Sequence, residues 1–432
     1  MRIKSFRQSI SAALALAVLA TCSLALAEPW PCFRGPTRQG VYEGPDLPTS
    51  WSATENVTWK VAIPGESWSS PIVYGDHVFI TTATNEGTSC HVICLDRASG
   101  EVLWDKEVFQ QTPLRKEQRN SYATPTPVTD GEHVWAVFAD GSVVCLTVGG
   151  EVVWTNRNFD FYSQHGLGAS PMLYGGTLLM PYDASSRGDD KKVGWQTPWD
   201  ESYLAALDAA TGEIVWKGDR GMSRIAHISP IRIEVGGTEQ ILSDAGDVVQ
   251  AFDPASGERL WTVRSEGEGV VPTPVVGDGL IFTASGFGDP AIRAVRPPDP
   301  ASGQPARIVW EQKRSVPMIP SMVYANELLF TVNERGITMC LDPATGETIW
   351  QDRLEGPHSP SPIVDGDRIY VLSEQGETSI LAAEREFRVL ARNSLGERCQ
   401  ASPAASDGQL FIRTAEHLYC IGQRQSNADA AP

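Results

Sequence analysis

The chain has 432 residues, in which 53 acidic side chains outnumber 35 basic ones and give a net charge of −18. So acidic a composition disfavours nucleic acids and anionic lipids as partners, because like charges repel. After residue 27 no run of 18 apolar residues occurs, so the sequence predicts no transmembrane helix there.

Residues 1–27 are predicted to be a secretory signal peptide. Three basic residues precede an apolar run over residues 10–26, and the small-residue pattern that ends at Ala27 is a cleavage site. A lipoprotein signal with its lipid on Cys22 is the alternative, although Thr21 fits that signal poorly. The mature chain then has 32 basic and 53 acidic residues, a net charge of −21. We expect a monomer that is periplasmic or secreted.

Three regions follow the signal peptide. Residues 28–54 are rich in Pro, Gly and Trp and show no periodicity, so we expect an irregular extension. Residues 55–422 contain repeats throughout and form one domain. Residues 423–432 are predicted to be a disordered polar tail.

An eleven-residue pattern recurs along the domain, with a small residue, Asp, Gly-Glu and a final Trp at fixed places. Full copies are CLDRASGEVLW (94–104), ALDAATGEIVW (206–216), AFDPASGERLW (251–261) and CLDPATGETIW (340–350). A large aromatic ring at this place is expected to pack between neighbouring repeats, and the Gly lets the ring approach the backbone. The predicted packing residues are Trp59, Trp104, Trp154, Trp216, Trp261, Trp310 and Trp350.

A second pattern, Ser or Thr followed by Pro and a β-rich run, marks the start of each repeat. Its prolines, with Ser321 as a looser copy, fall at positions 71, 127, 171, 230, 274, 321, 362 and 403. Each repeat therefore has four short strands in roughly 40–50 residues, which is the size of one propeller blade. The sequence predicts an all-β protein, an eight-bladed β-propeller.

Closure of the ring is predicted at the N-terminal strand. The last repeat ends at Gly422 and lacks a strand with Trp, whereas the strand around Trp59 stands alone before the first repeat. Pairing these two segments completes the last blade and hides both edges. Blade 7 departs from the pattern, with Leu390 at the expected Trp position.

Seven cysteines remain after the signal peptide. Cys94, Cys145, Cys340 and Cys420 occupy the small-residue position of a repeat, so we expect inert core thiols. The pairing of the other three, Cys32, Cys90 and Cys399, stays open, and a disulfide from Cys32 to Cys399 is one alternative.

The repeat resembles the tryptophan-docking motif of quinoprotein, or PQQ-type, alcohol dehydrogenase-like propellers. Residues 30–36 (WPCFRGP), 393–397 and 418–422 are similar to the PQQ-like propellers of planctomycete type, with Cys32 where Gln is usual. BamB-type lipoproteins, non-enzymatic scaffolds of outer-membrane protein assembly, are more distant relatives in this resemblance. Quinoprotein dehydrogenases add a Cys-Cys pair, a calcium site and a catalytic Asp, and this chain has no Cys-Cys pair.

Two sets of residues outside the repeat pattern are candidate sites. His165, Arg224, His227 and His358 precede inner strands, so they are candidates for a small-anion or metal site at the channel mouth; ordinary polar loop residues are the alternative. The inserts at 110–123, with Arg115, Lys116 and Arg119, and at 183–202 are long loops on a rigid scaffold. In the second, Trp195 and Trp199 either anchor a partner or cover a blade edge.

These observations favour an exported, non-catalytic scaffold that presents loops and a central funnel to a protein, peptide or glycan partner. No catalytic residue is assigned, since the sequence contains no G-x-S-x-G, H-E-x-x-H or P-loop motif. The alternative is a PQQ-dependent oxidoreductase acting on an alcohol or a sugar, with PQQ and calcium in the channel. No cofactor is expected for the scaffold.

Overall fold

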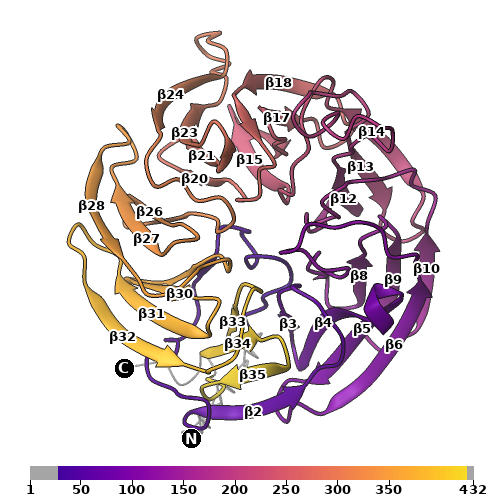
Figure 1. Cartoon of the computed structure of the whole chain (residues 1–432), viewed down its shortest axis with the longest axis vertical. Coiled ribbons are helices and arrows are strands. Elements are labelled where there is room, and N and C mark those ends of the chain that lie inside the picture. The colour runs from indigo at the N-terminus through magenta and orange to yellow at the C-terminus, as the bar shows by residue number, and fades with distance from the viewer. Residues whose placement is uncertain (1–27, 426–432) are drawn as a thin grey trace, which may run out of the picture.

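Eight blades of four strands stand around a central axis as in a propeller, and β1 adds a fifth strand to the sheet of blade 7 (Figure 1). The structure is a computed structural model, and it describes residues 28–425. The predicted eight-bladed all-β fold is confirmed, and the one helical segment described is the short η1 (Asn85–Gly87). The predicted signal peptide and residues 426–432 of the predicted tail lie outside the described residues.

In each blade the strands follow one another from the axis outward. In chain order the strands are blade 1, β3 (Ile72–Tyr74), β4 (His77–Thr84), β5 (Ser89–Asp96) and β6 (Val102–Gln110); blade 2, β7 (Val128–Thr129), β8 (His133–Val137), β9 (Val143–Thr147) and β10 (Val152–Asn156); blade 3, β11 (Met172–Tyr174), β12 (Thr177–Tyr182), β13 (Tyr203–Asp208) and β14 (Ile214–Asp219); blade 4, β15 (Ile231–Val235), β16 (Thr238–Leu242), β17 (Val248–Phe252) and β18 (Arg259–Arg264).

The second half of the ring has the same plan. Its strands are blade 5, β20 (Val275–Gly277), β21 (Leu280–Ser285), β23 (Ala291–Arg296) and β24 (Arg307–Gln312); blade 6, β25 (Val323–Ala325), β26 (Leu328–Val332), β27 (Ile337–Leu341) and β28 (Thr348–Arg353); blade 7, β29 (Ile363–Asp365), β30 (Arg368–Leu372), β31 (Glu377–Ala382) and β32 (Val389–Ser394); blade 8, β33 (Ala404–Ser406), β34 (Gln409–Arg413), β35 (His417–Ile421) and β2 (Val57–Ala62).

The ring closes as predicted. Strand β2 pairs antiparallel with β35, and Trp59 lies opposite Cys420. The outermost strand of blade 8 therefore comes from the beginning of the chain, which leaves no unpaired edge at the closure point.

The outer rim is held by the repeated tryptophans. Trp154 illustrates the arrangement: its indole Nε1 donates to Ala209 O of the next blade at 3.0 Å. The ring lies against Gly212, where φ is +74° and an added Cβ would be 2.4 Å from the ring. The same pairing with the Gly of the following turn occurs at Trp59, Trp104, Trp216 and Trp310.

Two blades depart from this pattern. The turn of blade 5 is longer, residues 297–306, and nothing lies within 4 Å of a Cβ added at its Gly303. The indole Nε1 of Trp261 donates instead to Gln240 Oε1 within its own blade at 2.8 Å. In blade 7 the prediction for Leu390 was wrong by one residue. Ala391 occupies the position of the tryptophan, opposite Ile380, and Leu390 is the bulged residue that points to solvent, 40% exposed.

The cysteines are all buried free thiols in the part of the chain that is described. Burial raises the pKa of the Cys94 and Cys145 thiols to about 12, as expected for inert core positions. The alternative of a Cys32–Cys399 disulfide is wrong. Cys32 Sγ instead donates to Gly35 O at 3.1 Å, and Cys399 Sγ to Glu397 O at 3.4 Å.

The N-terminal extension, for which the sequence predicted no function, runs across the lower end of the central channel. We call residues 28–47 the plug; its trace is the indigo line through the middle of the ring in Figure 1. It contains β1 (Val41–Tyr42), which pairs parallel with β29. The backbone of Trp30 exchanges two hydrogen bonds with Val73 of β3, at 2.8 and 2.9 Å.

The plug bonds to seven of the eight blades. Besides blades 1 and 7, its groups bond to blades 2, 3, 5, 6 and 8 through Pro31–Thr129, Arg38–Pro171, Gln39–Val276, Arg34–Met322 and Glu28–Asp407. Buried guanidinium groups carry two of these links, and burial lowers the pKa of Arg34 to about 9. The plug thereby ties the inner strands together from below.

The Ser/Thr-Pro signals form a ring of hydrogen bonds around the channel. Ser70 N–H donates to Thr126 Oγ1 at 2.9 Å, and Thr126 N–H donates to Ser170 Oγ at 3.0 Å. Four further bonds link Ser170–Ser229, Thr273–Ser321, Ser321–Ser361 and Ser361–Ser402. In these six bonds a hydroxyl accepts the backbone N–H of the preceding blade, whereas the Ser70 hydroxyl has no partner among the described residues.

Residues 423–425 of the predicted tail lie against the ring. Arg424 Nη1 is 2.6 Å from Asp76 Oδ1, and Gln425 N–H donates to Asp407 O. Among the described residues, no helix is long and apolar enough to cross a membrane.

Candidate binding funnel

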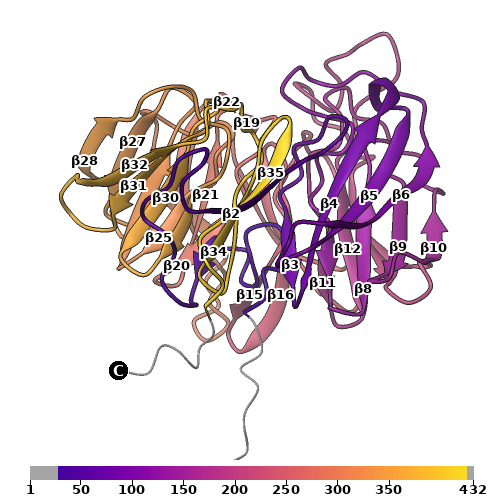
Figure 2. The ribbon, with the colours of Figure 1, turned by 90° about the horizontal axis from the view of Figure 1, so that it is seen from below.

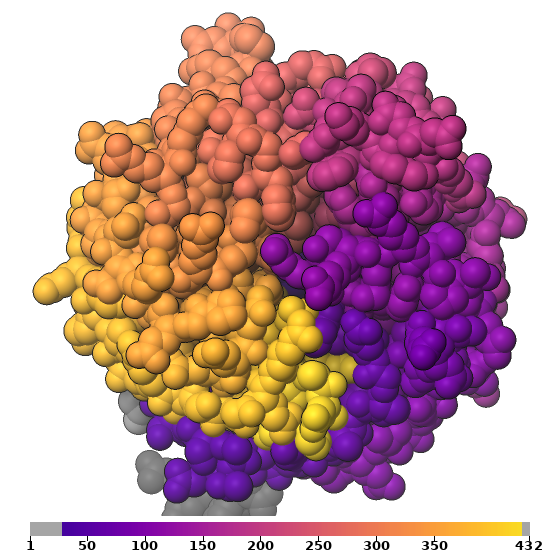
Figure 3. Space-filling view, viewed as in Figure 1, coloured from indigo at the N-terminus to yellow at the C-terminus, as the bar shows by residue number. Residues whose placement is uncertain are grey.

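A cavity of about 460 Å³ opens at the upper end of the channel. This upper face carries the loops that join one blade to the next; it faces the viewer in Figures 1 and 3 and is uppermost in Figure 2. Phe33 of the plug lines the cavity from below, as do the hydroxyl-bearing residues of the Ser/Thr ring. We call this cavity the funnel; because the plug crosses the channel beneath it, it is a blind pocket.

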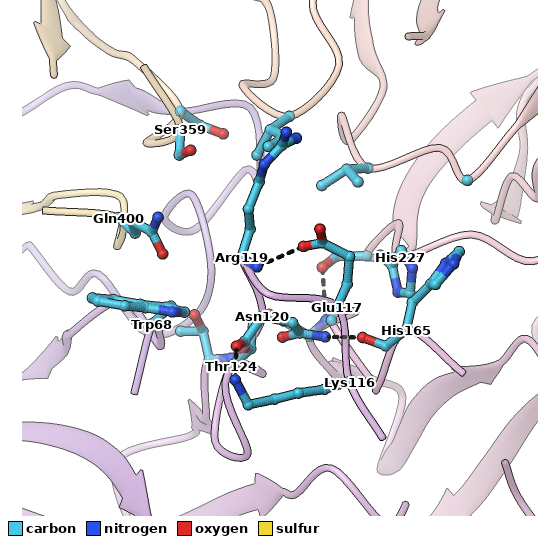
Figure 4. Close-up of a pocket in the computed structure, with 18 of the residues that line it drawn as sticks. Trp68, Lys116, Glu117, Arg119, Asn120, Thr124, His165, His227, Ser359 and Gln400 are labelled. Carbon is cyan, nitrogen blue, oxygen red and sulfur yellow. Dashed lines mark hydrogen bonds between the residues drawn. The ribbon is translucent and has the colours of Figure 1, made fainter. Parts of the chain in front are cut away.

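The insert at 110–123 forms one wall of the funnel, which the sequence did not predict. Arg115, Lys116 and Arg119 all line the cavity. Lys116 Nζ donates to Asn120 O at 2.6 Å, and Asn120 Nδ2 donates to His165 O at 2.9 Å (Figure 4). These bonds hold the insert against the loop between blades 2 and 3.

Three of the predicted site residues come together beside this insert. The rings of His165 and His227 lie 5.9 Å apart, and Trp195 meets His165 edge-on at 5.3 Å. All three line the funnel. Burial lowers the pKa of both imidazoles, to about 3 for His227, so the two histidines are neutral at neutral pH.

The other predicted site residues lie outside the funnel wall. Arg224 Nη1 donates to Gly267 O at 3.1 Å. His358 is 1% exposed, with its Nδ1 bonded to Gly356 O at 3.1 Å, and burial lowers its pKa to about 4. Trp199 pairs through its backbone with Ser223, which fixes the base of the second insert. The four predicted channel-mouth residues therefore do not converge.

Three polar atoms at the funnel have no hydrogen-bond partner among the described residues. They are the indole Nε1 of Trp68, the hydroxyl of Ser70 and the amide Oε1 of Gln400. Ser70 is 1% exposed. A buried polar atom without a partner is costly, so these groups suit a ligand that donates and accepts hydrogen bonds. Trp68 and Gln400 stand on the wall facing the two histidines (Figure 4).

The charge of the funnel is opposite to that of the whole chain. Three cations and one carboxylate, Glu117, line it, whereas the whole chain carries −18. Neither Arg115 nor Arg119 forms a side-chain hydrogen bond or ion pair within residues 28–425. A positive wall in a negative protein concentrates field lines and attracts anions.

The lining does not fit the calcium site that a quinoprotein enzyme needs. Calcium takes six to eight oxygen ligands, several of them carboxylates, and the funnel offers Glu117 alone, beside three cations. Asp183, the first residue of the second insert, is buried in an ion pair with Arg220. Calcium chemistry is therefore not supported by these donors.

A carboxylate–imidazole cluster occurs away from the funnel, in blade 8 and the loop before it. Glu397, Glu416 and His417 bring their ligand atoms within 4.8 Å of one another. Glu397 already accepts hydrogen bonds from Lys60, Thr414, His417 and Tyr419 at 2.6–2.9 Å. Those hydrogen bonds outweigh burial and lower its pKa to about 2, which marks a structural network at the ring closure.

The sequence predicted part of this site. The Ser/Thr-Pro pattern includes the hydroxyl-bearing residues of the ring, but it was interpreted only as the start of each repeat and not as part of a binding site. Trp68 lies two residues before that pattern in blade 1 and Gln400 two residues before it in blade 8. Nothing in their neighbourhood indicated that the two loops meet, because that contact depends on ring closure.

A family model with the description "Outer membrane protein assembly factor BamB" matches residues 37–158, 91–350 and 295–416. No curated protein matches the sequence. Among solved structures, BamB from Moraxella catarrhalis is similar at 14% identity and a TM-score of 0.59, covering 84% of this chain and 99% of that one.

Two enzymes share the fold as well. A europium-containing methanol dehydrogenase is 10% identical with a TM-score of 0.64, covering 92% of this chain and 98% of that one. The quinohemoprotein alcohol dehydrogenase ADHIIG from Pseudomonas putida HK5 is 10% identical with a TM-score of 0.53, covering 94% and 82%. These similarities concern the fold alone. Because the family matches together run from residue 37 to residue 416, the chain is a PQQ-like β-propeller that belongs to the family described as outer membrane protein assembly factor BamB.

Proposed function

We propose that the protein is an exported, non-catalytic scaffold whose upper face and funnel receive a segment of a protein partner. The observation that supports this most strongly is the funnel itself: a blind pocket with a cationic rim and three unpaired polar atoms. Family membership supports a protein as the partner, since the matching model is named for an assembly factor.

Two features weigh against chemistry in the funnel. General acid–base catalysis needs groups whose pKa values are near the working pH, whereas the two histidines have lowered pKa values and remain neutral. The single carboxylate that lines the cavity, Glu117, is exposed and accepts the backbone N–H of Arg119. Neutral histidines and one exposed carboxylate suit binding better than proton transfer.

Photo-crosslinking in the native envelope tests the proposal. A benzoylphenylalanine at Gln118, exposed on the first insert, is compared with one at Glu213, exposed in a lower-face turn. We expect a discrete protein adduct from position 118 and none from position 213. Adducts from position 213 alone, or from neither position, would contradict an upper-face partner.

The quinoprotein alternative has its own measurement. Calorimetric titration with PQQ in the presence of Ca²⁺ is expected to show no saturable heat, because Glu117 is the one carboxylate of the described residues that lines the funnel. One-to-one binding tighter than about 10 μM, roughly −7 kcal/mol, would replace the scaffold proposal by an oxidoreductase.

A further inference from the structure

The funnel's chemistry narrows the class of ligand that it takes. Resting on the function proposed above, we propose that the funnel binds the acidic tip of an extended peptide, with a carboxylate held by Arg115 and Arg119 and a main-chain amide held by Trp68 and Gln400. Nothing in the family match specifies such a ligand.

The first step concerns charge. Arg119 extends toward the middle of the funnel mouth (Figure 4), and its guanidinium has no bonded partner within the described chain. The nearby carboxyl of Glu334 forms no ion pair with Arg119; its Oε1 accepts the backbone N–H groups of Met318 and Ile319 at 2.5 and 2.7 Å. A guanidinium forms its strongest hydrogen bonds with a carboxylate, which it engages through two parallel bonds. The arginines are therefore open to a carboxylate from outside.

The second step concerns the neutral polar atoms. The Trp68 indole only donates a hydrogen bond, the free Oε1 of Gln400 only accepts one, and the Ser70 hydroxyl does either. A peptide unit supplies one acceptor and one donor a few ångströms apart. A peptide unit that accepts from Trp68 and donates to Gln400 would satisfy both atoms, and a buried polar atom without a partner is otherwise costly.

The third step concerns shape. Phe33 and the plug lie beneath the cavity, so a chain cannot thread through the ring. A volume of about 460 Å³ is typical of small-ligand sites, so the funnel admits only a short segment. A loop tip or a chain end fits these limits.

Charge also separates this ligand from neutral sugars. A sugar without a carboxylate would leave Glu117 as the one carboxylate of the described residues beside the three cations of the funnel. An acidic sugar shares the carboxylate chemistry, and it enters the test as the competing ligand.

The experiment measures binding of triglutamate to the full-length mature protein by calorimetry at 50 mM and 300 mM salt. Trilysine and galacturonate serve as comparison ligands. We expect saturable one-to-one binding of triglutamate that weakens at the higher salt, no binding of trilysine, and galacturonate at least tenfold weaker than triglutamate.

Variants locate the site. Replacing Arg115 and Arg119 together by Gln is expected to weaken triglutamate binding at least tenfold, and Gln400→Leu about threefold to tenfold. The matched control is Arg296→Gln, which removes one positive charge from an exposed strand end away from the funnel; we expect less than a twofold change. Melting curves identify any variant that has lost its fold, and for such a variant Arg119→Lys is used in its place.

Several outcomes would overturn the proposal: no saturable triglutamate binding up to 10 mM, galacturonate binding as tight as triglutamate, or an equal loss in Arg296→Gln. These results are separable from a failure of the scaffold. A discrete adduct at position 118 without triglutamate binding would keep the partner and reject the acidic tip, whereas the absence of both would reject both.

Discussion

The outer rim and the inner rim of this propeller are held together in different ways. At the outer rim each interaction repeats: a tryptophan packs on the turn glycine of the next blade, as Trp154 does on Gly212, 58 positions away. At the inner rim the Ser/Thr hydroxyl bonds also repeat between neighbouring blades, but a single segment, the plug, reaches seven blades with bonds that do not repeat. Glu28 and Asp407, for example, are separated by 379 positions.

The difference shows that repeated and unrepeated contacts have separate structural roles in this closed ring. Repeated contacts join neighbours and so set the number of blades and their spacing. The unrepeated plug closes one end of the channel, and that turns an open ring into a pocket with a floor. The two rims are therefore expected to respond differently to mutation, pH and truncation.

Deletion of residues 28–47 is expected to have the largest effect, because it removes the plug and leaves the tryptophan rim unchanged. Trp30 and Tyr42 are 1% and 2% exposed, and burying each such ring contributes on the order of 4 kcal/mol. We expect the free energy of unfolding in urea to fall by at least about 5 kcal/mol. Removal of residues 426–432 is the control; a plug deletion that unfolds at the parent's midpoint would show that the outer rim suffices.

Trp216→Ala tests the outer rim. Its ring is 9% exposed, packs on Gly257 and donates to Pro254 O at 3.2 Å, so we expect a loss of about 3–5 kcal/mol in the free energy of unfolding. Trp261→Ala, whose indole bonds within its own blade, should cost about 2 kcal/mol. Equal losses in urea denaturation would mean that the contact with the turn glycine adds little.

The outer rim and the loop between β16 and β17 should also differ in the sign of their pH dependence. At the outer rim, hydrogen bonds from Ser99 and Ser256 lower the pKa of Asp96 and Asp253. Their stabilisation is present above pH 4 and is lost as the pH falls below it. In the loop between β16 and β17, burial instead raises the pKa of Asp244 to about 7. The folded state then holds the extra proton between about pH 4 and 7, so stability declines as the pH rises through that window.

Asp244→Asn is expected to remove the decrease in the free energy of unfolding between about pH 4 and 7. Relative to wild type, the variant should gain on the order of 2 kcal/mol between pH 5 and pH 8, because each unit of pKa shift corresponds to about 1.4 kcal/mol. Urea denaturation at four pH values measures the gain. Asp253→Asn is the matched control and should show no gain; a parallel pH profile for wild type and Asp244→Asn would contradict the assignment.

The smallest expected effect is the difference between two glycine substitutions, which distinguishes the cost of backbone strain from the cost of a clash with the Trp154 ring. Gly212→Ala places a methyl group 2.4 Å from the Trp154 ring at a φ of +74°, whereas Gly175→Ala has a φ of +55° and nothing within 4 Å. Left-handed backbone costs an alanine about 1–2 kcal/mol at either place. We expect Gly212→Ala to lose about 1–2 kcal/mol more than Gly175→Ala in thermal or urea unfolding. Equal losses would show that the ring moves aside without cost.

Particular residues show which sequence-based predictions were correct and which were wrong. The position of Trp59 was sufficient to predict ring closure, since the last repeat lacked that strand. Leu390 was misplaced by one residue because the turn of blade 7 is one residue longer than in the motif. Residues 382–388 separate the paired Leu381 and Val389, whereas residues 342–347 separate the paired Leu341 and Thr348 of blade 6. Of the candidate site residues, His165, His227 and Trp195 meet at the funnel, while Arg224, His358 and Trp199 lie outside its wall.

The sequence by itself determined the eight blades, the strand that closes the ring and the packing of the rim tryptophans, because each of these depends on a short pattern that recurs along the chain. Only the tertiary structure decided that residues 28–47 plug the channel and that Arg119, Trp68 and Gln400 face one pocket. Those contacts join residues that are far apart in the chain and occur once each. No periodic pattern in the sequence predicts these contacts, and they form only when the ring has closed.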